Sequence, residues 1–182
     1  MKHIEQIIRW GGLAAVLGLA WAISTGRTHA ADARPLTEIG TEYLVTAVAP
    51  GSLPQDIFKQ AREQHGLEAW SGVIHQFIEN NVGGKGSVVE FETVYRDASM
   101  PTGRIIYVWR SAVMANGDKL VSEGHFIPQT DGTLVANVQL VPELGTGRFA
   151  GATGAYTELR AIPGGFVAQG TITLVTPRAP SE

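Results

Sequence analysis

The sequence contains no cysteine, and only 17% of its 182 residues are charged. Without cysteine, a disulfide framework, a thiolate zinc site and a cysteine nucleophile are all excluded. The net charge of −3 at pH 7 offers no basic footprint for a nucleic acid. The chain also has no phosphate-binding loop, dinucleotide fingerprint or nucleophile elbow. What remains is a chain long enough for one domain with a hydrophobic core.

The histidines do not follow the spacing of a metal motif. His65 and His75 are ten residues apart, and His125 is far from both in the sequence. We interpret His65 and His75 as residues on the surface of helices, and we expect neither a metal nor another cofactor.

The first thirty residues have the features of a secretory signal peptide. Basic residues precede an apolar run over 10–23, and small residues follow up to Ala30. A retained membrane anchor is the alternative, but the run has about fourteen residues where a spanning helix needs roughly 20. We therefore expect cleavage near Ala30, a mature domain over residues 31–182 and a periplasmic or secreted location. Contact with the membrane would be limited to the signal peptide before cleavage.

Residues 53–80 show helical rather than strand periodicity. Ser52 and Gln55 form a capping box, and Gly66 can end a helix, so we predict a helix over 53–65. Beyond it, apolar residues recur at spacings of three and four, which predicts a second helix. These apolar residues are Leu67, Trp70, Ile74, Phe77 and Ile78.

Most of the remaining chain is expected to form strands. The predicted strands are 41–49, 88–97, 104–114, 119–127, 133–142, 147–150, 154–161 and 166–175. Asn116-Gly117 and Asp131-Gly132 supply the positive φ angles of tight hairpins, and strands joined by hairpins are antiparallel neighbours. About eight strands suffice to close a small barrel. The predicted fold class is all-β, a closed antiparallel up-and-down barrel of about eight strands with a short helical insertion near its N-terminus.

The most specific motif is the glycine-rich segment Gly145-Thr146-Gly147-Arg148-Phe149-Ala150-Gly151-Ala152-Thr153-Gly154. Glycines around one aromatic residue indicate a bulge or a sharp corner where backbones approach closely. The segment resembles the glycine-rich corner of allene oxide cyclase and dirigent proteins, which lies in an eight-stranded barrel. Glu123-Gly124-His125 and the Asp131-Gly132 hairpin agree with this resemblance, which covers roughly residues 88–175.

The resemblance implies a bacterial, exported barrel of the allene oxide cyclase-like type, similar to calycins in overall form. Members of this group steer cyclisations or radical couplings by shape, often as homotrimers. The resemblance therefore implies a small hydrophobic molecule as partner, no cofactor, and a homo-oligomer such as a trimer or dimer.

A barrel that steers a reaction needs a mostly apolar cavity with a few placed polar groups. Glu123 and His125 share one face of a predicted strand, where a carboxylate beside an imidazole would transfer protons. Arg110 is the third catalytic candidate. An exposed polar face, or a cross-strand ion pair with Arg110, is the alternative interpretation of the pair. The functional hypothesis predicts that Glu123 and His125 face the barrel interior.

Four further residues are candidates for binding a ligand. Tyr107 and Trp109 share a strand face and would stack on an aromatic or polyene ligand, although strand aromatics are more often core residues. Glu92 shares a face with Glu90; they form either a buried pair with one raised pKa or, as we favour, two solvated glutamates on the outer face. Phe149, at the centre of the glycine-rich segment, is the fourth candidate.

Together these observations predict a cofactor-free cyclase- or isomerase-like barrel that steers a small hydrophobic substrate mainly by confinement. The alternatives are a lipocalin-like carrier without catalysis and a structural envelope protein. Inward charge beside an open cavity would favour the enzyme, and a cavity with apolar walls alone would favour the carrier. A barrel filled by its own side chains would favour the structural protein.

Overall fold

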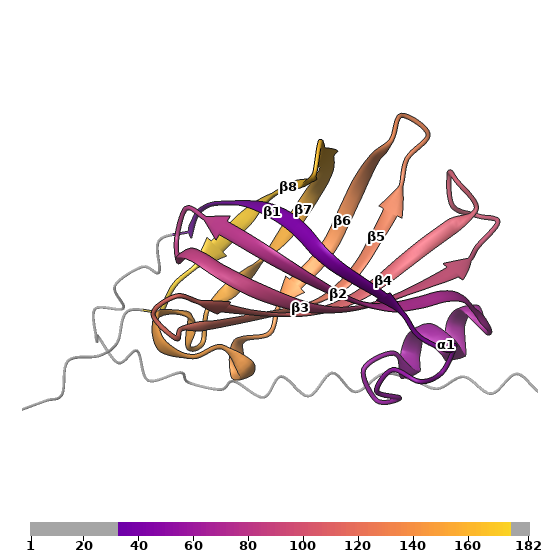
Figure 1. Cartoon of the computed structure of the whole chain (residues 1–182), viewed down its shortest axis with the longest axis horizontal. Helices are drawn as coiled ribbons and strands as arrows, with labels where there is room; N and C mark the ends of the chain where they lie inside the picture. The colour runs from indigo at the N-terminus through magenta and orange to yellow at the C-terminus, as the bar shows by residue number, and fades with distance from the viewer. Residues whose placement is uncertain (1–32, 176–182) are drawn as a thin grey trace, which may run out of the picture.

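The computed structural model describes residues 33–175, which form eight strands and one short α-helix (Figure 1). The strands are β1 (Ala33–Ala47), β2 (Glu68–Asn80), β3 (Gly84–Arg96), β4 (Arg104–Met114), β5 (Lys119–Pro128), β6 (Thr133–Leu140), β7 (Thr153–Ile162) and β8 (Gly165–Thr173), and the helix is α1 (Lys59–His65). Each strand pairs antiparallel with the next, and β1 also pairs with β8, so the barrel is closed. The predicted all-β class and the closed barrel are confirmed.

Two sequence predictions, the signal peptide and its cleavage site near Ala30, lie outside the described residues. Among residues 33–175, no helix is long and apolar enough to span a membrane.

The alternation of side chains along the strands decides which residues face the lumen, the interior of the barrel. On β3, β4 and β5 the even-numbered side chains point inward, where Val88, Val108 and Phe126 belong to one buried core. The odd-numbered side chains of these strands point outward. The registers between β3 and β4 and between β4 and β5 contain no shift, so this assignment holds along their paired lengths.

The predicted second helix is wrong, because residues 68–80 form β2. Trp70, Ile74 and Ile78 are four residues apart, a spacing that fits a helix face and the inward face of a strand equally well. Phe77 and Leu67, which completed the helical pattern, are 59% and 93% exposed. Pairing with β1 and β3 therefore determined the conformation, and the helix predicted over 53–65 is reduced to α1.

The glycine-rich segment forms a sharp corner that leads into β7. Residues 142–144 and 147–149 are single 3₁₀ turns, so the strand predicted over 147–150 is wrong, and β2 completes the eight strands instead. Gly147 and Gly154 have φ angles of +59° and +144°. A Cβ atom on Gly154 would collide with the carbonyl oxygen of Thr171, which is the close backbone approach that the motif predicts.

The glycine corner also fills one end of the barrel. Phe149 is fully buried in the main core, and a Cβ atom on Gly83 would lie 2.8 Å from both its ring and the Met114 sulfur. Its ring thus lies under the β2–β3 turn and beside the end of β4. Phe149 is therefore a core residue of the closed end of the barrel, where packing leaves it no access to a ligand.

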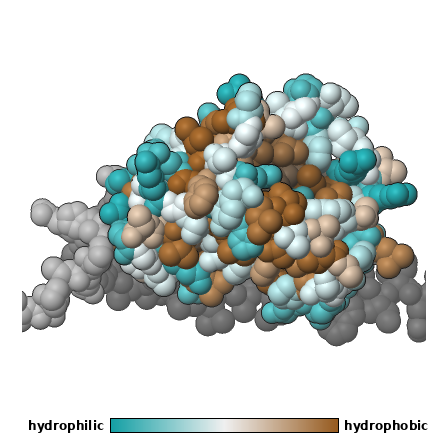
Figure 2. Space-filling view, viewed as in Figure 1, coloured by the Kyte–Doolittle hydropathy of each residue, from teal (hydrophilic) through white to brown (hydrophobic). Residues whose placement is uncertain are grey.

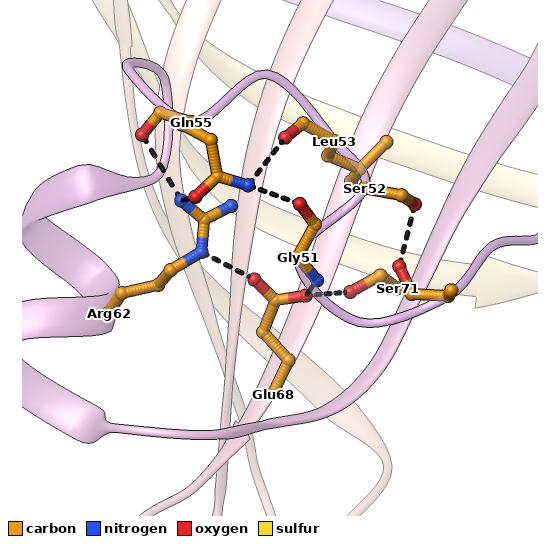
Figure 3. A network of polar contacts seen from close by, with 8 residues as sticks. Gly51, Ser52, Leu53, Gln55, Arg62, Glu68 and Ser71 are labelled. Carbon is orange, nitrogen blue, oxygen red and sulfur yellow. Dashed lines mark hydrogen bonds and ion pairs between the residues drawn. The ribbon is translucent and has the colours of Figure 1, made fainter.

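The opposite end of the barrel carries the long connection between β1 and β2, which includes α1. A polar network fixes this connection to the start of β2 (Figure 3). The Glu68 carboxylate accepts hydrogen bonds from Arg62 Nε (2.7 Å), from the Gly51 N–H (2.8 Å) and from the Ser71 hydroxyl. Beneath the helix, Ala61 packs on Tyr95 and on its neighbour Ile105. As a result α1 covers the outer surface of β3 and β4 near this end, which we call the open end because a cavity lined by Trp70 and Glu92 opens there.

Candidate functional site

A charged cluster occupies the lumen, centred on Arg110 of β4. Its Nη2 lies 2.7 Å from Glu38 Oε1 and 3.3 Å from Gln76 Oε1. Its Nε lies 2.7 Å from Glu90 Oε2, but the N–H does not point at that oxygen, so this contact is an ion pair without a hydrogen bond. The Tyr156 hydroxyl donates a hydrogen bond of 3.0 Å to Glu38 Oε2. Four strands thus contribute polar groups around one guanidinium.

Because the cluster is buried away from water, its charged groups must compensate one another. The Arg110 side chain is 5% exposed, and its guanidinium lies 5.5 Å from the ring centroid of Tyr156. Burial alone would lower the pKa of Arg110, but Glu38 and Glu90 raise it, so the guanidinium keeps its charge. Burial, and then the negative charge of Glu38, raises the pKa of Tyr156, which therefore remains a hydrogen-bond donor.

Glu92 lies one inward position further along β3 from Glu90, toward the open end. Burial, followed by the carboxylates of Glu90 and Glu42, raises its pKa well above the ordinary 4.5. Burial also raises the pKa of Glu90, although Arg110 opposes this effect. The single guanidinium of Arg110 does not neutralise the carboxylates of Glu38, Glu42, Glu90 and Glu92 together. Glu92 therefore retains its proton more readily than an exposed glutamate does.

A cavity of about 500 Å³ opens beside Glu92. Trp70 and Val94 form apolar walls, and Arg96 and Arg104 stand at its exposed edge. Gly72 makes room for the indole, because a Cβ atom at this position would collide with the Trp70 ring. The arrangement places one protonatable carboxyl between an apolar wall and two cations.

The structure places three of the candidate residues in the barrel interior: Arg110 and Glu92 in the polar cluster, and Phe149 in the closed end. Glu90 and Glu92 both point into the barrel, so the buried pair is observed and the two solvated glutamates that we favoured from the sequence are wrong. The carboxylate of Glu90 can be buried because Arg110 supplies the compensating charge.

Glu123 and His125 point away from the lumen, so the prediction that they face the interior is wrong. Leu120, Ser122 and Phe126 hold the inward positions of β5, and alternation places the odd-numbered residues outside. A cross-strand pair of Glu123 with Arg110 is excluded as well, because the two side chains lie on opposite faces of the sheet. Instead, Glu123 and His125 line a cavity of about 560 Å³ on the outer surface beside α1.

Tyr107 and Trp109 also point outward. The Tyr107 ring lies 5.4 Å from the His125 ring, between centroids, and lines the same outer cavity. Trp109 stacks on Phe91 with centroids 5.5 Å apart. Neither ring forms a wall of the lumen, so any stacking of a ligand on them would take place on the outer surface of the barrel.

Sequence reasoning missed Glu38, Gln76, Trp70 and Tyr156 as parts of the interior. Glu38 lies in β1, which begins at residue 33, whereas the sequence predicted that the first strand begins at residue 41. Gln76 and Trp70 were assigned to a helix. Leu36, Glu38 and Gly40 share the inward face of β1, but a leucine, a glutamate and a glycine form no hydrophobic alternation that the sequence could have revealed.

No protein-family model matches this chain, and no curated protein matches it in a sequence comparison. Among residues 33–175, no group of three or more histidine, aspartate or glutamate side chains is arranged to hold a metal ion.

Proposed function

We propose that the barrel binds a small, mostly apolar molecule at its open end and isomerises or cyclises it without a cofactor, like the allene oxide cyclase-like proteins that it resembles. The observation that carries this proposal is Glu92, an inward carboxyl with a raised pKa beside an apolar wall and a cavity of about 500 Å³. A carrier has no need of such a group, since holding a carboxyl in this environment destabilises the fold.

Glu92 acts as the proton donor and acceptor. In its neutral form the carboxyl gives its proton to an oxygen or a carbon of the bound molecule, and the resulting carboxylate takes a proton from another carbon. The overall reaction is an isomerisation, so the protein is unchanged at its end. Glu38, Arg110 and Glu90 keep the neighbouring charge fixed, while Trp70 restricts the shapes that the substrate adopts.

The edge of the cavity suggests one more property of the substrate. Arg96 and Arg104 are opposite each other in the register between β3 and β4, and both line the cavity. Two guanidinium groups at the rim favour a molecule with an anionic group, such as a carboxylate, at one end of its apolar body. The anion would lie at the rim and the apolar body beside Trp70.

Native mass spectrometry of protein purified from its own host would identify a bound molecule, whose conversion is then followed by chromatography that separates isomers. The enzyme proposal expects Glu92→Gln to keep binding and to reduce turnover by roughly 10²–10⁴-fold. Glu158→Gln, on the outer surface of β7, is the matched control and should keep full turnover. Binding without conversion by the unchanged protein would instead support a carrier.

We also propose that the protein is exported and that copies of the chain associate. Several large apolar side chains are exposed on the outer surface of β1 and β2, and hydrophobic groups lie among polar ones on this side of the molecule (Figure 2). They include Ile39, Tyr43, Leu44 and Phe77, of which Tyr43 and Phe77 stack with centroids 4.3 Å apart. Analytical ultracentrifugation would reveal a dimer or trimer, and the intact mass of periplasmic material would locate the cleavage site near Ala30.

A further inference from the structure

The cavity on the outer surface of β4 and β5 is separate from the lumen and has its own chemistry. It has a volume of about 560 Å³, and α1 forms one of its sides. The polar network between Arg62 and Glu68 fixes α1 in this position (Figure 3). The cavity is therefore part of the ordered fold, with a helix on one side and the barrel wall on the other.

A chain of hydrogen-bonding groups runs along this cavity. His65 Nδ1 lies 3.3 Å from Asp97 Oδ2, and His65 Nε2 lies 3.1 Å from the Tyr107 hydroxyl. If Nδ1 carries the proton, it donates to Asp97, and Nε2 accepts from Tyr107. Asp97 is thus already engaged by His65, and the neighbouring Ser99 donates to it through both its N–H (2.9 Å) and its hydroxyl (2.6 Å).

The charges of the cavity have one sign. Asp97 and Glu123 are the acidic groups among its described lining residues, and none of these residues is lysine or arginine. Because Asp97 is engaged, the exposed Glu123 is the carboxylate available to a ligand. Burial, and then the electrostatic effect of the nearby His65, lowers the pKa of His125, so its ring is neutral at pH 7 and adds no positive charge.

The remaining surface is aromatic and apolar. The Tyr107 ring lies 5.5 Å from His65 and 5.4 Å from His125, between centroids, so three rings stand together on this wall. Ile57, just before α1 in the chain, and Ile127, on the sheet side, provide partly exposed apolar side chains. Aromatic faces attract cations, and apolar surface holds the body of a ligand.

We propose that this outer cavity is a second ligand site, which binds a small organic cation with a primary ammonium group on an aromatic body. The ammonium group lies between the Glu123 carboxylate and the ring of Tyr107, and the aromatic body packs on the partly exposed Ile57 and Ile127. This preference is opposite in charge to that of the rim of the lumen, where Arg96 and Arg104 stand. The proposal does not depend on catalysis in the lumen.

Calorimetric titration with phenethylamine tests the proposal, with 2-phenylethanol and phenylacetate as neutral and anionic probes of similar shape. We expect phenethylamine to bind most tightly. Glu123→Gln should weaken the binding of phenethylamine by about fivefold, the effect of losing one solvent-exposed ion pair, and should leave that of 2-phenylethanol unchanged. Glu79→Gln, an exposed carboxylate on the outer surface of β2, is the control and should alter neither affinity.

The location of binding is tested by NMR. Phenethylamine should shift the ring resonances of His65 and His125, and Tyr107→Leu should reduce the affinity because it removes the aromatic face. Glu92→Gln should not change the affinity, which separates this site from the lumen. The proposal is overturned if phenethylamine binds no better than 2-phenylethanol, if Glu79→Gln weakens it as much as Glu123→Gln does, or if the shifts appear at Trp70 in place of the two histidines.

Discussion

Arg110 and Glu38 form an ion pair across the lumen, with Nη2 and Oε1 2.7 Å apart, although β2 and β3 separate their strands in the sheet. The pair links two parts of the barrel wall that have no backbone pairing with each other. Since Glu90 contacts the same guanidinium, the removal of one side chain leaves two buried carboxylates without a counter-charge.

Arg110→Met should therefore destabilise the protein strongly. Removing one partner of a buried ion pair leaves an uncompensated charge, which costs about 3–5 kcal/mol. Urea denaturation at pH 7 measures the free energy of unfolding. The triple variant with Glu38→Gln and Glu90→Gln added should recover much of the loss, because it also removes the two negative charges. A single variant within 1 kcal/mol of the unchanged protein, on the scale of an ordinary surface mutation, would contradict the role of the cluster.

Glu92→Gln should stabilise the fold at neutral pH. The pKa of Glu92 is raised by burial, then by Glu90 and Glu42, so the folded state holds a proton that the unfolded state has released above pH 4.5. The stability associated with this proton is present below pH 4.5 and is lost as pH rises through the folded-state pKa. Glutamine does not titrate, so the variant lacks this pH dependence. We expect its free energy of unfolding to increase by about 1 kcal/mol at pH 7, the usual gain from one stabilising substitution.

Thermal unfolding of both proteins between pH 4 and 8 checks this prediction. The two melting temperatures should be closest at pH 4 and should separate as pH rises. A difference that is constant over this range would mean that the titration of Glu92 does not contribute.

The barrel was largely predictable from the sequence because hairpin signals are local. Asn116-Gly117 and Asp131-Gly132 lie in the β4–β5 and β5–β6 turns, and both glycines have positive φ angles. The strand β2 was not predictable in this way. Its large apolar inward residues repeat every four positions, which cannot separate a helix from a strand, and only the pairing with β1 and β3 decides between them.

The site was harder to predict, because alternation groups residues on a face without saying which face is inside. Glu123 and His125 were correctly placed on one face, as were Tyr107 and Trp109. Both faces of β4 and β5 carry apolar residues, since α1 covers part of the outer surface. The partner of Arg110 was also hidden, because Glu38 is 72 residues away in the sequence.

The glycine corner gives a prediction about backbone geometry. Gly154 and Gly117 both have positive φ angles, but only at Gly154 would a Cβ atom meet another strand, at Thr171. Gly117→Ala should lose about 1–2 kcal/mol through its backbone conformation alone. Gly154→Ala should lose distinctly more, because the β7–β8 pairing must move. Equal losses in urea denaturation would show that the approach of the two strands at this corner is not tight.

The outer cavity gives a prediction about titration. Burial, and then the repulsion from His65 when that ring is protonated, lowers the pKa of His125 below 6.5. NMR titration of the ring resonances should give a midpoint below that value, and His65→Gln should move it upward because one repulsive charge is removed. A midpoint that is unchanged in His65→Gln would show that the two rings do not interact electrostatically.

The attachment of α1 has a pH dependence opposite in sign to that of Glu92. Burial alone would raise the pKa of Glu68, but hydrogen bonds from Ser71, Gly51 and Arg62 outweigh it and lower the pKa below 4.5. The ionised carboxylate therefore stabilises the fold above pH 4.5, and this stability is lost as pH falls through the folded-state pKa. Glu68→Gln should cost about 1–3 kcal/mol at pH 7, since it weakens charge-assisted hydrogen bonds.

Hydrogen exchange locates the effect of Glu68→Gln. The amides of α1 should exchange faster in this variant, while those of β6 to β8, on the other side of the barrel, should be unchanged. Glu63→Gln is the control, because Glu63 is an exposed residue of α1 whose nearest cation, Lys59, is 3.9 Å away. If both variants exchanged alike, the polar network around Glu68 would not be what holds the helix over the outer cavity, and the walls of that cavity would depend on the packing of Ala61 and Tyr95 alone.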